Sequence, residues 1–177
     1  MRFSAPTFLL VLFALLCLSV AGRGAAATHV VINEFDSDPP GDTTILKDEW
    51  VELFNPTSQA IDVGGWMINA THGDPENYTI PIGTTIQPLG YLVIQPGRQW
   101  LDDEGEVIVL KDTVGNIVDT TLNATDRYND EGSWQRFPNG QDTDSDADWA
   151  FRSPTKDLSN GGETVTTTTT TSPTTTT

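Results

Sequence analysis

The sequence predicts an all-β domain built as a sandwich of two facing sheets. Short apolar runs rich in β-branched residues alternate with breaks that contain Pro and Gly, at the spacing typical of a sandwich. No window of a dozen residues shows the 3.6-residue periodicity of an amphipathic helix. The one Cys, Cys17, lies close to the N-terminus, so a disulfide framework and a thiolate metal site are both excluded further along the chain. The stability of the domain must therefore come from its core.

The 177 residues divide into three parts: a signal peptide (1–27), a folded domain (28–162) and a disordered Thr-rich stalk or linker (163–177). The first part has the anatomy of a secretory leader, with Arg2, an apolar run from Phe8 to Val20 and three Ala before a cleavage site at Thr28. That run is shorter than the roughly 18 to 20 residues that span a bilayer. An uncleaved N-terminal anchor is the alternative. In the last part 11 of the residues 164–177 are Thr, a composition that cannot bury apolar area and stays extended.

Strands are expected within the domain at 29–35, 49–55, 61–68, 106–111, 116–120, 133–137 and 148–152, and further short apolar runs flank the turn segments PIGT and QPLGY. In the second strand, alternation places Val51 and Leu53 on the core face and the side chains between them on the other face. This pattern predicts a half-buried sheet. Gly64-Gly65 within the third strand predicts a bulge or a close backbone approach that positions Trp66. The segment DTVG between the fourth and fifth strands predicts a hairpin connection.

The charge balance excludes one class of partner. The formal net charge is −16, and it becomes −18 when Arg2 and Arg23 leave with the signal peptide. Nucleic acids are bound mainly by Lys and Arg that neutralise phosphates, so we expect no nucleic acid partner. Three Lys stand against seventeen Asp. Such a bias suits either a protein kept soluble at high salt or an ordinary acidic secreted protein.

Six segments of the chain resemble a known family in their order: INEF, WVELFNPT, DVGGWMI, YTIPIGTTIQPLGYLVI, EVIVLKDTVGNIVD and SWQRFPNGQDTDSDADW. Over residues 29–162 the sequence is similar to the lamin tail domains of secreted bacterial and archaeal proteins. The resemblance implies an immunoglobulin-like β-sandwich without catalytic residues of its own. In nuclear lamins the module docks proteins and chromatin. This chain has neither a coiled-coil rod nor a basic patch, so chromatin binding and filament assembly are not carried over.

An acidic run near the end of the domain is a candidate cation site. Four Asp recur at every second position: Asp142, Asp144, Asp146 and Asp148. Calcium takes six to eight oxygen ligands, and alternating Asp in a turn supplies several of them. The run does not match an EF-hand, which needs Gly where Ala147 stands and an acid where Ser153 stands. The alternative is a solvated loop whose Asp side chains cap turns. A second acidic turn, at Asp36 and Asp38, is a possible neighbour in space.

Three sequons fit the N-glycosylation pattern of a secreted chain and lie in or next to expected loops. Their acceptor residues are Asn69, Asn77 and Asn123, whereas Pro56 excludes Asn55. Use of these sites requires a host with the glycosylation machinery.

The aromatic residues and histidines give little support for chemistry. Three of the Trp lie within expected strands, and we expect Trp100 and Trp149, next to loops, to be freer. An exposed Trp would be able to stack on a sugar ring. With only His29 and His72 available, neither an activated nucleophile nor a zinc site is expected.

The sequence therefore favours a non-catalytic extracellular module, secreted or attached to the cell surface, that binds or displays from a Thr-rich spacer. Its expected partner is a protein or a polymer of the cell envelope. No cofactor is expected apart from calcium. One alternative is a structural building block of an extracellular or envelope assembly. Another is a hydrolase that uses paired carboxylates.

Overall fold

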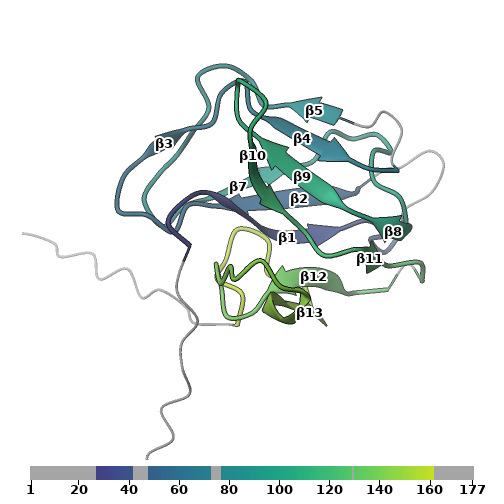
Figure 1. The fold of residues 1–177 in the computed structure, drawn as a ribbon. Helices are drawn as coiled ribbons and strands as arrows, with labels where there is room; N and C mark the ends of the chain where they lie inside the picture. Colours follow the sequence, from purple (N-terminus) through teal and green to yellow (C-terminus); the bar gives the residue numbers. More distant parts are fainter. Residues whose placement is uncertain (1–26, 42–47, 73–76, 129, 162–177) are drawn as a thin grey trace, which may run out of the picture.

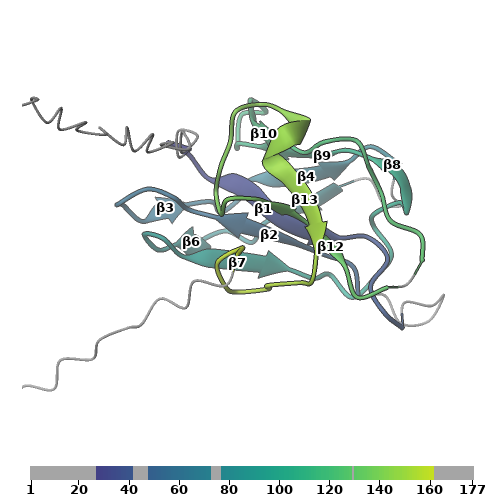
Figure 2. The same cartoon turned by 90° about the horizontal axis from the view of Figure 1, so that it is seen from below.

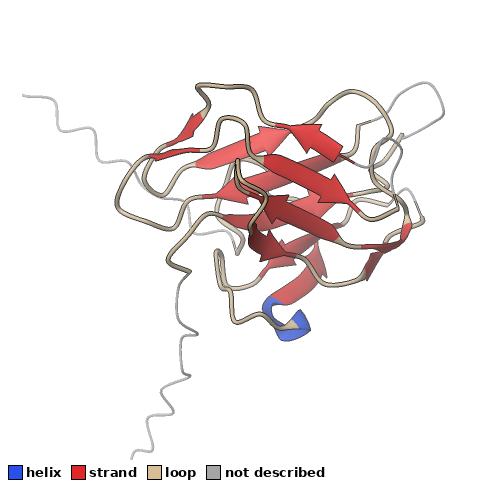
Figure 3. Cartoon of the chain, turned by 45° about the horizontal axis from the view of Figure 1, so that its top comes forward, coloured by secondary structure: helices blue, strands red, loops and turns tan. Residues whose placement is uncertain are grey.

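The computed structural model describes residues 27–41, 48–72, 77–128 and 130–161. All but the last residue of the predicted signal peptide, and the whole predicted Thr-rich stalk, lie outside these residues. Within the described ranges, strands dominate and the one helix is a single 3-10 turn, Asp146–Asp148 (Figure 3). No helix in these ranges is long and apolar enough to cross a membrane. The all-β prediction is confirmed.

Two antiparallel sheets form the layers of an immunoglobulin-like sandwich (Figure 1). The five-stranded sheet has the order β13 (Trp149–Arg152), β12 (Ser133–Arg136), β1 (Val31–Asp36), β2 (Trp50–Phe54) and β7 (Tyr91–Ile94). The four-stranded sheet has the order β10 (Ile117–Thr120), β9 (Ile108–Lys111), β4 (Met67–Ala70) and β5 (Asn77–Thr79). Two short pairs extend the layers, β11 (Ala124–Thr125) with β8 (Glu104–Glu106) and β3 (Ile61–Asp62) with β6 (Thr85–Ile86).

The core lies between the layers, and strand register determines which side chains enter it. Val51 is opposite Phe35 on one side and Ile94 on the other, so three apolar side chains form one row across the sheet. Leu53 forms the neighbouring row with Ile32. Val51 and Leu53 are fully buried, as the alternation predicts. The facing sheet contributes side chains that are likewise buried: Ile68, Ala70, Ile108 and Leu110.

The prediction of a half-buried sheet is wrong, because the outer face of β2 is also covered. Trp50, Glu52 and Phe54 expose only 2%, 0% and 6% of their surface. The C-terminal segment, residues 153–161, runs across this face beside β2 and β7 (Figure 2). The alternation in β2 therefore separates an apolar interior from a second, polar interior.

A row of polar side chains fills this second interior. Gln135, Glu34 and Glu52 stand opposite one another on β12, β1 and β2. The C-terminal segment supplies donors to the two acids: Thr155 bonds Glu34 through its amide at 2.8 Å and its hydroxyl at 2.7 Å, and the Asp157 amide bonds Glu52 at 2.6 Å. Two like charges opposite each other would otherwise destabilise the sheet. The segment is therefore an integral layer of the fold.

The predicted third strand is in fact two strands joined by a turn. β3 and β4 flank a turn in which the Trp66 amide bonds the Val63 carbonyl at 3.0 Å. Gly65 takes a φ of +81°, which a residue with a Cβ rarely adopts. Gly64 lies so close to the backbone of Gly83 that a Cβ would reach 2.6 Å from its nitrogen. The pair makes a turn and not a bulge, whereas the predicted close approach is confirmed.

One further predicted strand is divided in the structure, and the predicted hairpin that follows it is present. The predicted strand 106–111 divides into β8 and β9, and β8 pairs with β11 instead of continuing the sheet. The DTVG hairpin between β9 and β10 is confirmed, with the Asp112 carboxylate accepting bonds from the amides of Val114 and Asn116 at 2.9 Å each.

Candidate functional site: a buried arginine behind the acidic loop

Arg136 of β12 is the centre of a buried, charged site. Its side chain is 1% exposed. The guanidinium donates to the Ile32 carbonyl at 2.8 Å, to Asp119 Oδ1 at 2.7 Å and to Asp142 Oδ1 at 3.0 Å. It also lies 4.7 Å from the centroid of the Trp149 ring, a cation–π distance. A buried guanidinium is tolerated only when its donors are paired in this way.

Asp119 joins the two sheets through this arginine. It lies on β10, in the four-stranded sheet, yet its Oδ2 accepts the Ile32 amide of β1 at 2.6 Å. Its Oδ1 faces Arg136 of β12. One carboxylate therefore holds two strands of the opposite layer.

The acidic loop is closed by the last of its four carboxylates. Asp148 accepts bonds from the Thr143 amide at 2.6 Å, from the Thr143 hydroxyl and from Gln141 Nε2 at 2.7 Å. Burial disfavours its charge, but the hydrogen bonds from Gln141 and Thr143 outweigh burial and hold the pKa of Asp148 below its ordinary value. Ser145 caps the 3-10 turn by accepting the Ala147 amide at 3.2 Å.

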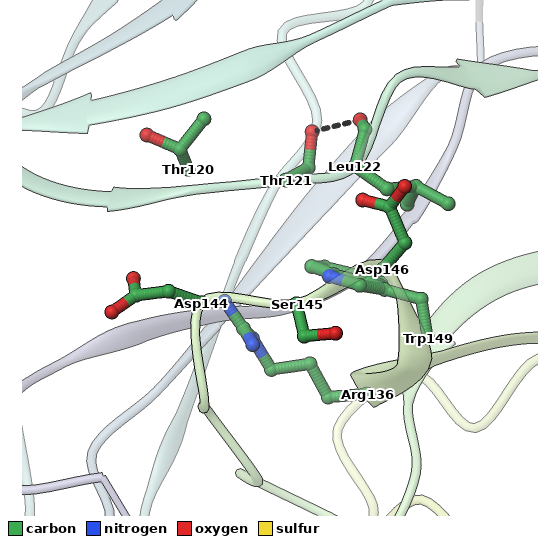
Figure 4. A pocket seen from close by; sticks show the side chains of 8 residues that line it. All are labelled: Thr120, Thr121, Leu122, Arg136, Asp144, Ser145, Asp146 and Trp149. Carbon is green, nitrogen blue, oxygen red and sulfur yellow. Dashed lines mark hydrogen bonds between the residues drawn. The ribbon is translucent and has the colours of Figure 1, made fainter.

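The structure separates the four predicted calcium ligands into two groups. Asp142 and Asp148 face inward to Arg136, at 3.0 and 3.7 Å. Asp144 and Asp146 are exposed and line a cavity of about 200 Å³ opposite Thr120 to Leu122 (Figure 4). Among the described residues no three His, Cys, Asp or Glu side chains are arranged to hold a metal ion. Calcium binding at this loop stays a prediction, with only two of its four carboxylates unengaged by Arg136.

The second acidic turn is at the other end of the sheet. His29, just before β1, lies 3.3 Å from Asp142, whereas Asp36 ends β1. Asp36 and Asp38 instead share their surroundings with Asp126. The sequence could not reveal this, because it does not show which way β1 runs past the acidic loop.

Burial and charge repulsion raise the pKa of two carboxyl groups in this second cluster, Asp126 and Asp36. Burial, followed by the negative charges of Asp130, Asp38 and Asp103, raises the pKa of Asp126 to about 7. Burial and the charge of Asp126 likewise raise the pKa of Asp36 to about 8.

The three sequons differ in accessibility. Asn69 is in β4, between β5 and β9, and is half-buried, so it does not lie in a loop. Asn77 is exposed on the edge strand β5, directly opposite Asn69. Asn123 is exposed in the loop before β11. The geometry therefore favours Asn77 and Asn123 as acceptors, and their use stays a prediction.

The tryptophans are placed differently from the expectation. Trp100 is 0% exposed, and its indole Nε1 donates to the Glu49 carbonyl at 3.3 Å. Trp149 is 9% exposed and packs edge-on against Phe35. The prediction that these two are freer than the other Trp is wrong, because both pack into the core. Trp134 is half-buried beside a surface cavity.

Two hydroxyl groups of the described residues lie beside a carboxylate or an imidazole. Ser133 Oγ donates to Glu34 at 2.8 Å, but this pair is buried beneath the C-terminal segment. His72 lies on the surface beside the Thr71 hydroxyl, at 3.1 Å. A nucleophile and its base must share an accessible pocket. Neither arrangement meets that condition.

Comparison with known proteins gives one family. The model of the Lamin Tail Domain matches residues 23–172, which include every described strand. The chain belongs to the lamin tail domain family. No curated protein matches the sequence. As a lamin tail domain, the protein is an immunoglobulin-like interaction module of a family that is typically non-catalytic.

The buried arginine of this lamin tail domain was missed at the level of sequence. Arg136 stands in the phrase SWQRF, between residues with alternating burial, and the phrase does not distinguish it from a surface residue. The sequence did offer one signal. Acidic residues are frequent between Asp119 and Asp148, and Arg127 and Arg136 are the two basic residues in this stretch.

Replacing Arg136 should destabilise the fold far more than replacing a surface arginine. Arg136→Ala leaves Asp119 and Asp142 buried without a cation, at a cost of about 3–5 kcal/mol. The control is Arg127→Ala, which removes an exposed ion pair with Glu104 and should cost less than about 1 kcal/mol. Urea unfolding followed by Trp fluorescence measures both. Equal effects of the two variants would contradict the assigned role of Arg136.

The calcium prediction can be tested by thermal melting with calcium or with a chelator. A ligand present at a hundred times its dissociation constant stabilises a protein by about 2.7 kcal/mol. Binding at the loop predicts a higher Tm with calcium, lost in Asp144→Asn with Asp146→Asn and retained in the surface control Glu131→Gln. A Tm that is the same with calcium and chelator excludes the site.

The raised pKa of Asp126 predicts that stability falls as the pH rises from 4 to 7. Between its ordinary pKa of 3.8 and the folded value of about 7, the folded protein holds a proton that the unfolded chain has lost. Asp126→Asn cannot titrate. It should match the wild type near pH 4 and exceed its free energy of unfolding by on the order of 1–2 kcal/mol at pH 8. Urea titrations of the wild type and of Asp126→Asn at pH 4 and pH 8 measure this. The prediction is refuted if the two proteins differ in free energy of unfolding by the same amount at both pH values.

Proposed function

We propose that this lamin tail domain is an extracellular binding module, exported by its leader and carried at the cell surface or in the medium on the Thr-rich segment. The observation that carries the proposal is that one lamin tail domain accounts for all the described strands, between a leader-like sequence and a Thr-rich one. Interaction surfaces, and not reaction centres, are what such a module offers.

The use of the charged side chains supports a binding role. Three ionisable side chains are buried and hydrogen-bonded within the fold: Arg136, Asp148 and Glu34. General acid–base chemistry would need such groups within reach of a substrate. What remains on the surface is mostly acidic, which favours a basic partner and disfavours nucleic acid.

Three measurements test the proposal. Expressed in a cell with a secretory pathway, the protein should appear outside the cell or be accessible to added protease on intact cells. Mass spectrometry should give Thr28 as the mature N-terminus and would also show any glycan on Asn77 or Asn123. The purified mature protein should bind washed cell envelopes saturably. Retention inside the cell with an intact leader would overturn the proposal.

A further inference from the structure

A small surface cavity lies between β12, β13 and the loop that follows β11. Its volume is about 260 Å³, and three of its lining side chains are aromatic: Tyr128, Trp134 and Phe151. The other lining residues are Thr125, Asp126, Arg127 and Asp130. This volume is below the roughly 300–1,000 Å³ of sites for drug-sized ligands, and suits a single side chain or a small cation.

The sheet builds the aromatic wall of the cavity. Trp134 of β12 is directly opposite Phe151 of β13, and their rings meet edge-to-face with centroids 5.4 Å apart. The Trp134 indole also donates to the Thr125 carbonyl at 3.3 Å, which ties the wall to the loop. Gly132 makes room for Phe151, because a Cβ at this position would overlap its ring. Tyr128, 79% exposed, stands at the rim.

Asp126 gives the cavity an anionic group without a partner. The residue is 4% exposed, and its Oδ2 is buried without a hydrogen bond from any described residue. Its charged neighbours Asp38, Asp103 and Asp130 repel a further negative charge. Arg127 also lines the cavity, but its guanidinium pairs with Glu104 at 3.1 Å. A buried carboxylate of this kind is costly unless a cation or donor compensates it.

We propose that this cavity binds an alkylammonium group, supplied by a lysine side chain of a protein partner. The aromatic faces of Trp134 and Phe151 offer apolar contact to the methylene chain and attract the cation through their ring quadrupoles. The ammonium group then pairs with the Asp126 carboxylate. A compact ammonium suits a cavity of about 260 Å³ better than the larger, planar guanidinium does.

The charge of the whole protein favours the same partner. With a net charge of −16, the protein attracts basic surfaces and orients them during diffusional encounter. A calcium ion, by contrast, needs six to eight oxygen ligands, and an aromatic wall supplies none. The inference deepens the proposed function and rests on it, because it gives the binding module a binding site.

Titration of the purified protein at pH 8 with n-butylammonium, observed by NMR and Trp fluorescence, tests the site. Saturable shifts of the Trp134 indole signal are expected. Binding should weaken at least tenfold in Asp126→Asn, weaken in the rim variant Tyr128→Ser, and stay unchanged in Glu131→Gln, which lies outside the cavity. n-Butanol and butyrate, which match the chain length but lack the cation, should not bind.

A second set of ligands identifies the source of the ammonium group. N-acetyl-lysine amide should bind at least as tightly as n-butylammonium, and the norleucine analogue should not bind. Binding of the free amine alone, or of calcium in place of both at Asp126, would overturn the lysine assignment. Saturable binding to cell envelopes that Asp126→Asn leaves unchanged would also overturn this inference, while leaving the proposed function intact.

Discussion

The two layers of this domain depend on one buried cation. Arg136 binds the backbone of the first strand, a carboxylate of the opposite sheet and the acidic loop, and its own strand lies between β1 and β13. In a chain without disulfides, such a group fixes how the layers sit on each other. Apolar packing alone tolerates small sliding of one sheet over the other, whereas directional bonds from a planar guanidinium do not. The loop therefore takes its shape from the arginine, and two of its four acids are committed to structure.

The C-terminal segment imposes a second constraint of the same kind. It places Thr155 and Asp157 amides on two acids that face each other across neighbouring strands. Asn160 completes the arrangement by donating to the carbonyls of Asn33 and Arg136 at 2.9 and 3.0 Å. This lamin tail domain thus has an apolar interior between its sheets and a polar one beneath its last residues. The C-terminal segment covers part of the outer face of the five-stranded sheet, and the aromatic cavity lies beside β12 and β13 of the same sheet.

Local pattern predicted much of the fold and little of the site. The alternation of Val51 and Leu53, the DTVG hairpin and the absence of helical periodicity are properties of neighbouring residues, and sequence displays them directly. The burial of Trp50 and Glu52 depends on residues about a hundred positions away, and no local signal marks it. Composition was a poor guide for the same reason. The alternating acids of 142–148 suggested a cation site, whereas no pattern in the sequence marks Asp126, whose Oδ2 is buried without a hydrogen bond from any described residue.

The pairing of β1 has a consequence for the order in which this protein can assemble. The first strand lies in the middle of its sheet, and one of its two neighbours, β12, is about a hundred residues further along the chain. The carbonyl of Asn33, in the same strand, accepts a hydrogen bond from Asn160, which is 127 positions further along the chain. A polypeptide emerging from the ribosome thus carries a central strand with one side open until nearly the whole domain has followed. Contacts this remote form slowly, so the five-stranded sheet is completed only after nearly the whole domain has been synthesised.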